Sequence, residues 1–87
     1  NTNSAALAQL LNKNYTEART TLSRIPQPDA TTAYLKAILA ARTHQAADVV
    51  ANLEQAFKLD STLKAHAAKD LEFANYFNTA DFQNITK

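Results

Sequence analysis

The stretch Asn14-Tyr15-Thr16-Glu17-Ala18 returns in altered form 31 residues later as Gln45-Ala46-Ala47-Asp48-Val49. The carboxylates of the two stretches coincide, and the same offset places Leu22 on Leu53. A carboxylate favours the first turn of a helix because it interacts with the positive end of the helix dipole. Each stretch is therefore expected to begin the second helix of a helix–turn–helix pair, and the chain is expected to use that pair twice.

Apolar residues at helical spacing extend this pattern over the rest of the chain. Helices are expected over residues 3–12, 15–25, 30–43 and 46–59, and Pro26 and Pro28 end the second of them. The tail, defined here as residues 62–87, is expected to form two short helices with a bend near Lys69–Asp70, then a last turn over residues 79–85. No alternating strand pattern is present, so the predicted fold class is all-α.

Polar residues stand where these helices are expected to begin. Asn3 or Ser4 is expected to cap the first helix, Asp29 the third, and Asp60-Ser61 the helix that opens the tail. Asp70 is expected to cap the helix after the bend. Because most carboxylates lie at such positions, capping explains them more simply than paired acid–base catalysis does.

The composition excludes several classes of site. The chain has 87 residues with no cysteine, glycine or methionine, and its 9 Lys and Arg against 8 Asp and Glu leave a net charge of +1. Without cysteine there is no disulfide or thiolate metal site, and without glycine there is no Gly-rich phosphate loop. Because the first residue is not methionine, we expect a segment of a longer protein.

Three stretches of the chain resemble a known family. The first unit contains Lys13-Asn14-Tyr15-Thr16-Glu17-Ala18, followed by Leu22 and Ile25, and the second ends in Ala56-Phe57-Lys58-Leu59-Asp60-Ser61. The former resembles the Gly-Asp/Asn-Tyr-x-x-Ala stretch of the tetratricopeptide repeat (TPR) family, and the latter looks like its Ala-Leu-x-Leu-Asp-Pro exit. Residues 69–82 resemble a segment that closes such an array after its final repeat.

The resemblance implies an all-α fold of antiparallel helix-hairpin repeats, a fragment of an α-solenoid with C-terminal capping helices. It divides the single domain, residues 1–87, into repeat 1 (1–28), repeat 2 (29–61) and a C-terminal cap (62–87). The sequence departs from the family pattern at the turns, where Lys13 and His44 replace the usual glycine, and in the first helix, where Gln9 replaces a large apolar residue.

In the TPR family, the first helices of successive pairs line a concave groove that binds peptides or partner segments. Carried over to this chain, the partner-binding residues would be Leu7, Thr31, Tyr34, Ile38 and Arg42. Tyrosine and arginine often anchor interfaces. The predicted function is therefore a non-catalytic scaffold that binds a protein or peptide. The alternative is a purely structural cap, in which case the leucines of the first helix face a missing upstream repeat.

Other chemistry has little support in the sequence. No serine or histidine stands in a nucleophile motif, so no catalytic residue is predicted and the chain is not expected to be an enzyme. His66 and Asp70 are four residues apart, but one such pair is a weak metal signal. We predict no metal and no cofactor. The aromatic residues of the tail are expected to form core; they are Phe73, Tyr76, Phe77 and Phe82.

Nucleic-acid and membrane partners are also not expected. A helix-turn-helix DNA binder is the less favoured alternative, because the basic residues are scattered and form no stripe along a helix. The longest apolar run, residues 37–41, is far short of the length needed to span a bilayer. The compartment is left open; we expect a soluble segment of a bacterial protein of the cytoplasm, periplasm or cell envelope.

Overall fold

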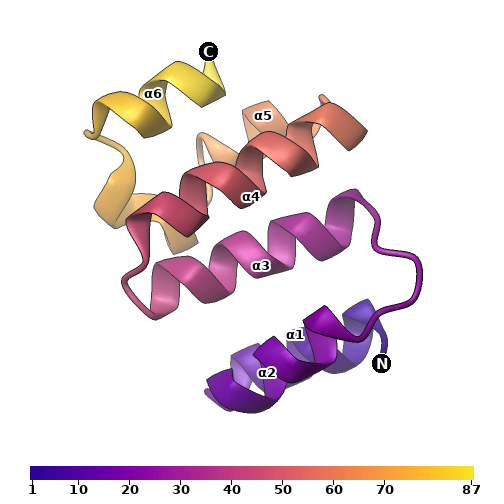
Figure 1. The fold of residues 1–87 in the computed structure, drawn as a ribbon. Helices are drawn as coiled ribbons and strands as arrows, with labels where there is room; N and C mark the ends of the chain where they lie inside the picture. The colour runs from indigo at the N-terminus through magenta and orange to yellow at the C-terminus, as the bar shows by residue number, and fades with distance from the viewer.

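The computed structural model describes all residues 1–87, and every regular element in it is a helix, which confirms the all-α prediction. The four longer helices are α1 (Asn3–Leu11), α2 (Tyr15–Ser23), α3 (Ala30–Arg42) and α4 (Ala46–Leu59). The tail contains α5 (Leu63–Ala67), the 3-10 helix η1 (Leu71–Tyr76) and α6 (Ala80–Thr86). Figure 1 shows α3 and α4 in the middle of the molecule, with α1 and α2 beneath them and α6 above.

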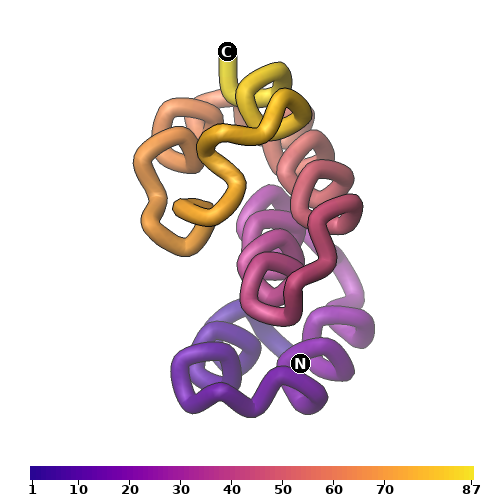
Figure 2. Tube along the Cα trace, turned by 90° about the vertical axis from the view of Figure 1, so that its left-hand side faces the viewer, coloured from indigo at the N-terminus to yellow at the C-terminus, as the bar shows by residue number.

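The helices pack as two pairs, α1 with α2 and α3 with α4, and α3 also contacts both helices of the first pair. The tail returns along the second pair, so that η1 packs on α3 while α6 packs on α4 and α5. In Figure 2 the tail and α1 lie on one side of α3, and α2 and α4 lie on the other. The molecule therefore has two distinct long faces, and α3 belongs to both.

The turns within the two pairs share one backbone geometry. Lys13 and His44 adopt left-handed conformations with φ of 63° and 59°. After each of them, a backbone N–H reaches back five residues: Asn14 N donates to Gln9 O and Gln45 N to Ala40 O, both at 2.8 Å. This is the hydrogen bond that commonly ends a helix at a left-handed residue, usually glycine. Lys13 and His44, the two turn positions where a glycine would be usual, are thus the two left-handed positions of the fold.

The helix caps agree with the sequence expectations in part. The side chain of Asp29 accepts from Thr32 N at 3.0 Å, and the side chain of Asp70 accepts from Glu72 N at 3.0 Å, so both expected caps are confirmed. The expected cap of α1 was wrong: Thr2, and neither Asn3 nor Ser4, is the cap, and its hydroxyl accepts from Ala5 N. Asn3 instead points to the start of α3, where its amide donates to Asp29.

The start of the tail and the end of α2 also differ from expectation. Ser61 caps nothing; Asp60 accepts from the backbone N–H and the hydroxyl of Thr62. Helix α2 ends at Ser23, two residues before the predicted end at Ile25. Pro26 disfavours the helical conformation for the residue before it, so the last turn unwinds early. Helix α4 has the predicted bounds.

The core centres on α3, where nine of 13 residues are buried. Large side chains from the other elements complete it, and Leu10, Leu22, Leu53 and Phe73 are at most 2% exposed. The expected core role of the tail aromatics is confirmed for Phe73 and Phe82, which are buried with ring centroids 5.9 Å apart, while Tyr76 and Phe77 are partly buried against them. The tail is therefore part of the hydrophobic core and not an appendage.

Candidate interaction surface

The five predicted partner-binding residues fall into two groups. Tyr34, Ile38 and Arg42 lie four residues apart along one face of α3, called the inner face here; Tyr34 and Ile38 are buried and Arg42 is half-buried. Thr31 is exposed at the start of the same helix. Leu7 lies on α1 and is 43% exposed. The tail covers the inner face, so these residues do not form one open groove.

Tyr34 is held by the tail through both its hydroxyl and its ring. The hydroxyl donates to Asp70 Oδ2 at 2.7 Å, and the ring meets Phe73 edge-on with centroids 5.6 Å apart. Burial, and then the hydrogen bond to Asp70, raises the pKa of Tyr34 far above its ordinary value. The ring of His66 packs against it at a tilted angle, with ring centroids 5.6 Å apart. Tyr34 thus links α3 to α5 and η1.

Arg42 joins three segments of the chain. Its Nε and Nη2 donate to the two carboxylate oxygens of Glu72 at 2.9 and 2.6 Å, and its Nη1 donates to Leu10 O at 2.9 Å. The guanidinium and the carboxylate form a two-pronged ion pair, the stronger geometry for such pairs. The hydrogen bond to Glu72 raises the pKa of Arg42. One side chain therefore fastens the end of α1 and the start of η1 to α3.

Sequence reasoning identified Asp70 only as a helix cap and Glu72 only as a neighbour of a weak metal pair. Their contacts with Tyr34 and Arg42 span 36 and 30 residues. No local periodicity connects residues so far apart in the chain. The one available signal was the match of residue types, since an Asp and a Glu two residues apart face a tyrosine and an arginine two helical turns apart.

Three of the four exposed large hydrophobic side chains lie on α1 and at the start of η1: Leu7 at 43%, Leu11 at 62% and Leu71 at 81% exposure. Leu11 follows Leu10 in the chain and Leu71 precedes Glu72, and both of those neighbours are bound by Arg42. Leu7 and Leu11 lie four residues apart and therefore share one face of α1. The exposed apolar surface belongs to α1, with Leu71 on the tail, and not to α3.

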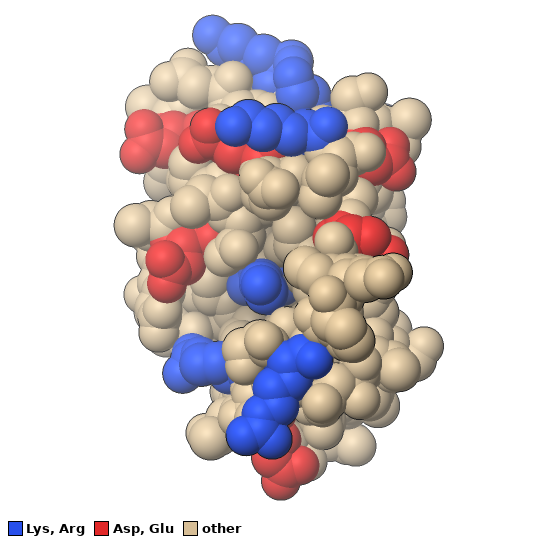
Figure 3. Space-filling view, turned by 45° about the vertical axis from the view of Figure 1, so that its right-hand side comes forward, with Lys and Arg blue, Asp and Glu red and all other residues tan.

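The ionisable residues form no cluster that could hold a metal ion. His66 Nε2 lies 3.8 Å from Asp70 Oδ2, and no group of three or more His, Asp or Glu side chains is placed to hold a metal ion. On the face shown in Figure 3, acidic and basic side chains are interspersed with uncharged surface. None of the helices combines the length and apolar character that crossing a bilayer requires.

Comparison with known proteins finds no relative of this chain. The chain matches no protein-family model, and it has no significant match among curated protein sequences or among solved structures.

Proposed function

We propose that this chain is a non-catalytic scaffold module of the TPR type, the last unit of a helical-hairpin array, which binds a protein segment on the surface left open by its tail. The division into repeat 1, repeat 2 and cap belongs to this proposal. The equal turn geometry at Lys13 and His44, 31 residues apart, supports the repeat.

The observation that carries the proposal is a pair of exposed leucines on one face of α1. The tail binds Tyr34 and Arg42, yet Leu7 and Leu11 on the neighbouring helix stay 43% and 62% exposed. Exposed apolar side chains that cluster commonly mark an interaction site, whereas scattered ones need no explanation. Leu71, at the start of η1, is exposed as well.

The alternative, a purely structural cap that binds nothing itself, has an observation of its own in its favour. The hydroxyl of Tyr34 is bound by Asp70, and the hydrogen bonds that Arg42 donates are taken by Glu72 and by the carbonyl of Leu10. In that case the α1 leucines would cover only a preceding hairpin of the same array.

A fusion experiment tests the array. A second copy of residues 1–28 placed before Asn1 is expected to stack on α1 and unfold with the rest in one transition, because hairpin repeats gain stability from their neighbours. The slope of the unfolding free energy against urea concentration should increase, because the added hairpin buries more surface in the folded state. A fusion carrying a scrambled copy is the control. An added hairpin that stays unfolded by circular dichroism, with unchanged stability of residues 1–87, would contradict the array.

A dye experiment tests the open surface. The fluorescence of 8-anilinonaphthalene-1-sulfonate is expected to rise with the folded chain and to fall in a Leu7→Asn, Leu11→Asn double variant. Leu59→Asn is the matched control, because Leu59 is 53% exposed but lies at the far end of α4. If the control lowers the fluorescence as much as the double variant does, the surface at α1 has no special affinity for apolar groups, and the structural cap is the better description.

A further inference from the structure

The tail is joined to the two helix pairs by side chains alone. No backbone hydrogen bond connects it to α1, α2, α3 or α4. Its side-chain hydrogen bonds to the helix pairs involve two residues of α3: Tyr34 donates to Asp70. Arg42 donates to Glu72, and the buried ring of Phe73 adds apolar contact. The tail can therefore leave the inner face without breaking any main-chain hydrogen bond to the helix pairs.

The connection between α4 and the tail is short and turns at one residue. It comprises residues 60–62. Asp60 is extended, with φ of −151° and ψ of 98°, whereas Thr62 is already in the helical region. A few residues at the end of an element commonly absorb the backbone change when one part of a protein moves against another. Short hinge loops are also the connections at which elements exchange between copies of a chain.

We propose that the tail is exchangeable between two copies of this chain, so that the tail of one copy occupies the inner face of the other. Asp70 of each copy then accepts from Tyr34 of the other copy, and Glu72 pairs with Arg42 in the same way. The occupant follows from the contacts themselves, because an identical tail brings identical groups to an identical surface. Reciprocal exchange fills both inner faces and closes the assembly as a two-fold dimer.

The exchange makes the same contacts that it breaks, so its equilibrium depends on protein concentration. Within one chain, a tail on a short connection competes at an effective concentration on the order of millimolar. A second copy competes with it only near that concentration, unless the contact within the chain is weakened and the contact between chains is not. The proposal is independent of the proposed function, which uses the open surface of α1 and not the inner face.

Two charge-reversed variants create that situation. Arg42→Glu places two carboxylates opposite each other within one chain, and Glu72→Arg places two guanidinium groups there. Mixing the variants restores an ion pair at both inner faces only if the tails exchange. Sedimentation velocity is expected to show a heterodimer that binds at least about tenfold more tightly than either variant binds itself, because two ion pairs replace two like-charge contacts.

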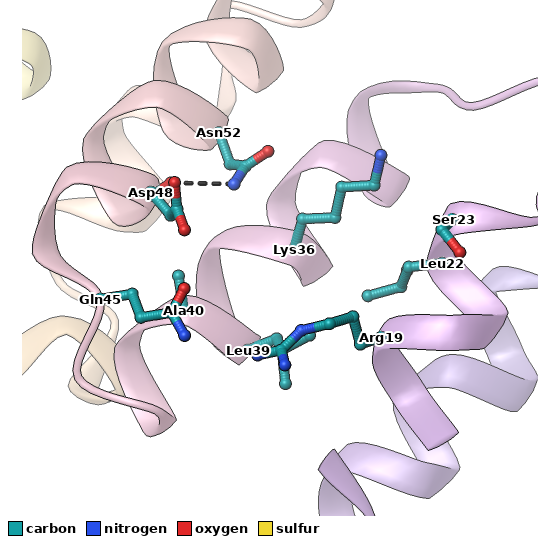
Figure 4. Close-up of a pocket in the computed structure, with 9 residues that line it drawn as sticks. All are labelled: Arg19, Leu22, Ser23, Lys36, Leu39, Ala40, Gln45, Asp48 and Asn52. Carbon is teal, nitrogen blue, oxygen red and sulfur yellow. Dashed lines mark hydrogen bonds between the residues drawn. The ribbon is translucent and has the colours of Figure 1, made fainter. Parts of the chain in front are cut away.

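The opposite side of α3 offers a matched control. Figure 4 shows Lys36 there, at a cleft of about 160 Å³ to which the tail contributes no residue. Lys36→Glu changes the charge of α3 as Arg42→Glu does, so its mixture with Glu72→Arg measures charge attraction alone and should form no such heterodimer. A chain that carries both Arg42→Glu and Glu72→Arg regains the pair internally. It is expected to be folded by circular dichroism and to associate as weakly as the parent chain.

The parent chain itself is expected to form dimers at concentrations above about 1 mM. The Leu7→Asn, Leu11→Asn double variant should form them equally well, because the exchange does not use the surface of α1. Three results would overturn the proposal. The first is a monomeric mixture of the charge-reversed variants while the chain with both reversals is folded, and the second is a parent chain that stays monomeric at several millimolar. The third is a parent dimer that the two leucine substitutions abolish, which would assign association to α1.

Discussion

At the scale of single residues, the two turns place side chains where the backbone favours glycine. Lys13 and His44 have φ near 60°, a region that costs most residues free energy because of their Cβ atom. A second local cost is Gln9, whose Oε1 is buried without a hydrogen-bond partner. Both costs fall at single positions, the first at the two turns and the second within α1.

Lys13→Gly and His44→Gly are each expected to stabilise the chain by about 0.5–1 kcal/mol, because glycine adopts positive φ without strain. The free energy of unfolding in urea measures the effect. Lys13→Ala and His44→Ala serve as controls, since they remove the side chain but keep the Cβ atom and should bring no gain. A glycine variant no more stable than its alanine counterpart would contradict the assigned strain.

The carboxyl group of Asp29 makes the free energy of unfolding depend on pH in the acidic range. Its carboxylate accepts hydrogen bonds from the backbone of Thr32 and from the side chains of Asn3 and Thr32, and these hold its pKa below the ordinary value of 3.8. The folded state therefore binds fewer protons than the unfolded state as pH falls below 3.8. Stability from this group is complete above that pH and is lost as the pH falls through the lowered value.

The matching measurement is urea unfolding of the parent chain and of Asp29→Asn between pH 7 and pH 2.5. The variant is expected to lose less stability on acidification, because it has no proton to take up at this position. Asp81→Asn is the control: Asp81 lies exposed in the first turn of α6 and outside this hydrogen-bond network. Parallel pH profiles of Asp29→Asn and the parent chain would show that the network does not lower the pKa.

At the scale of elements, the tail owes its position to a few contacts with α3. The ion pair of Arg42 and Glu72 has side chains that are 23% and 28% exposed, so it is partly shielded from water. In a double-mutant cycle with Arg42→Gln and Glu72→Gln, the coupling energy is expected to be about 1 kcal/mol, at the upper end for pairs near a surface. A cycle of Arg42→Gln with Glu54→Gln, which do not touch, should give no coupling.

Hydrogen exchange tests whether the ion pair of Arg42 and Glu72 specifically holds η1 on α3 or only stabilises the fold as a whole. If Arg42 holds η1 on α3, the amides of residues 71–77 are expected to exchange faster in Glu72→Gln, while those of α4 keep their protection. Equal loss of protection in both elements would mean that the pair acts on global stability only.

The sequence predicted the elements well and their long-range contacts poorly. Local signals sufficed for α3 and α4, because Asp29 caps one helix and the apolar period of the other runs unbroken to Leu59. They did not suffice for the inner face, because Tyr34 and Arg42 meet partners that lie 36 and 30 residues away. Residue types suited to an interface were present there, but the tail, which lies in the same chain, is what contacts them.

At the scale of the whole molecule, stability depends on one core shared by both helix pairs and the tail. Leu53 is 0% exposed, and Leu53→Ala is expected to cost about 2–4 kcal/mol through lost burial and the cavity left behind. Leu71→Ala is the control, because Leu71 is 81% exposed and its loss should cost under about 0.5 kcal/mol. Urea unfolding measures both, and similar costs for the two variants would contradict the assigned packing.

Arg42 also decides how the chain would bear mechanical tension. A pull on the C-terminus acts first on α6, which packs on α4 and α5 through the buried Phe82. Only after α6 has detached does the force reach Glu72, whose hydrogen bonds to the guanidinium of Arg42 hold η1 on α3, while the same guanidinium binds the carbonyl of Leu10. Under force, the tail would peel away first, and both helix pairs would outlast it.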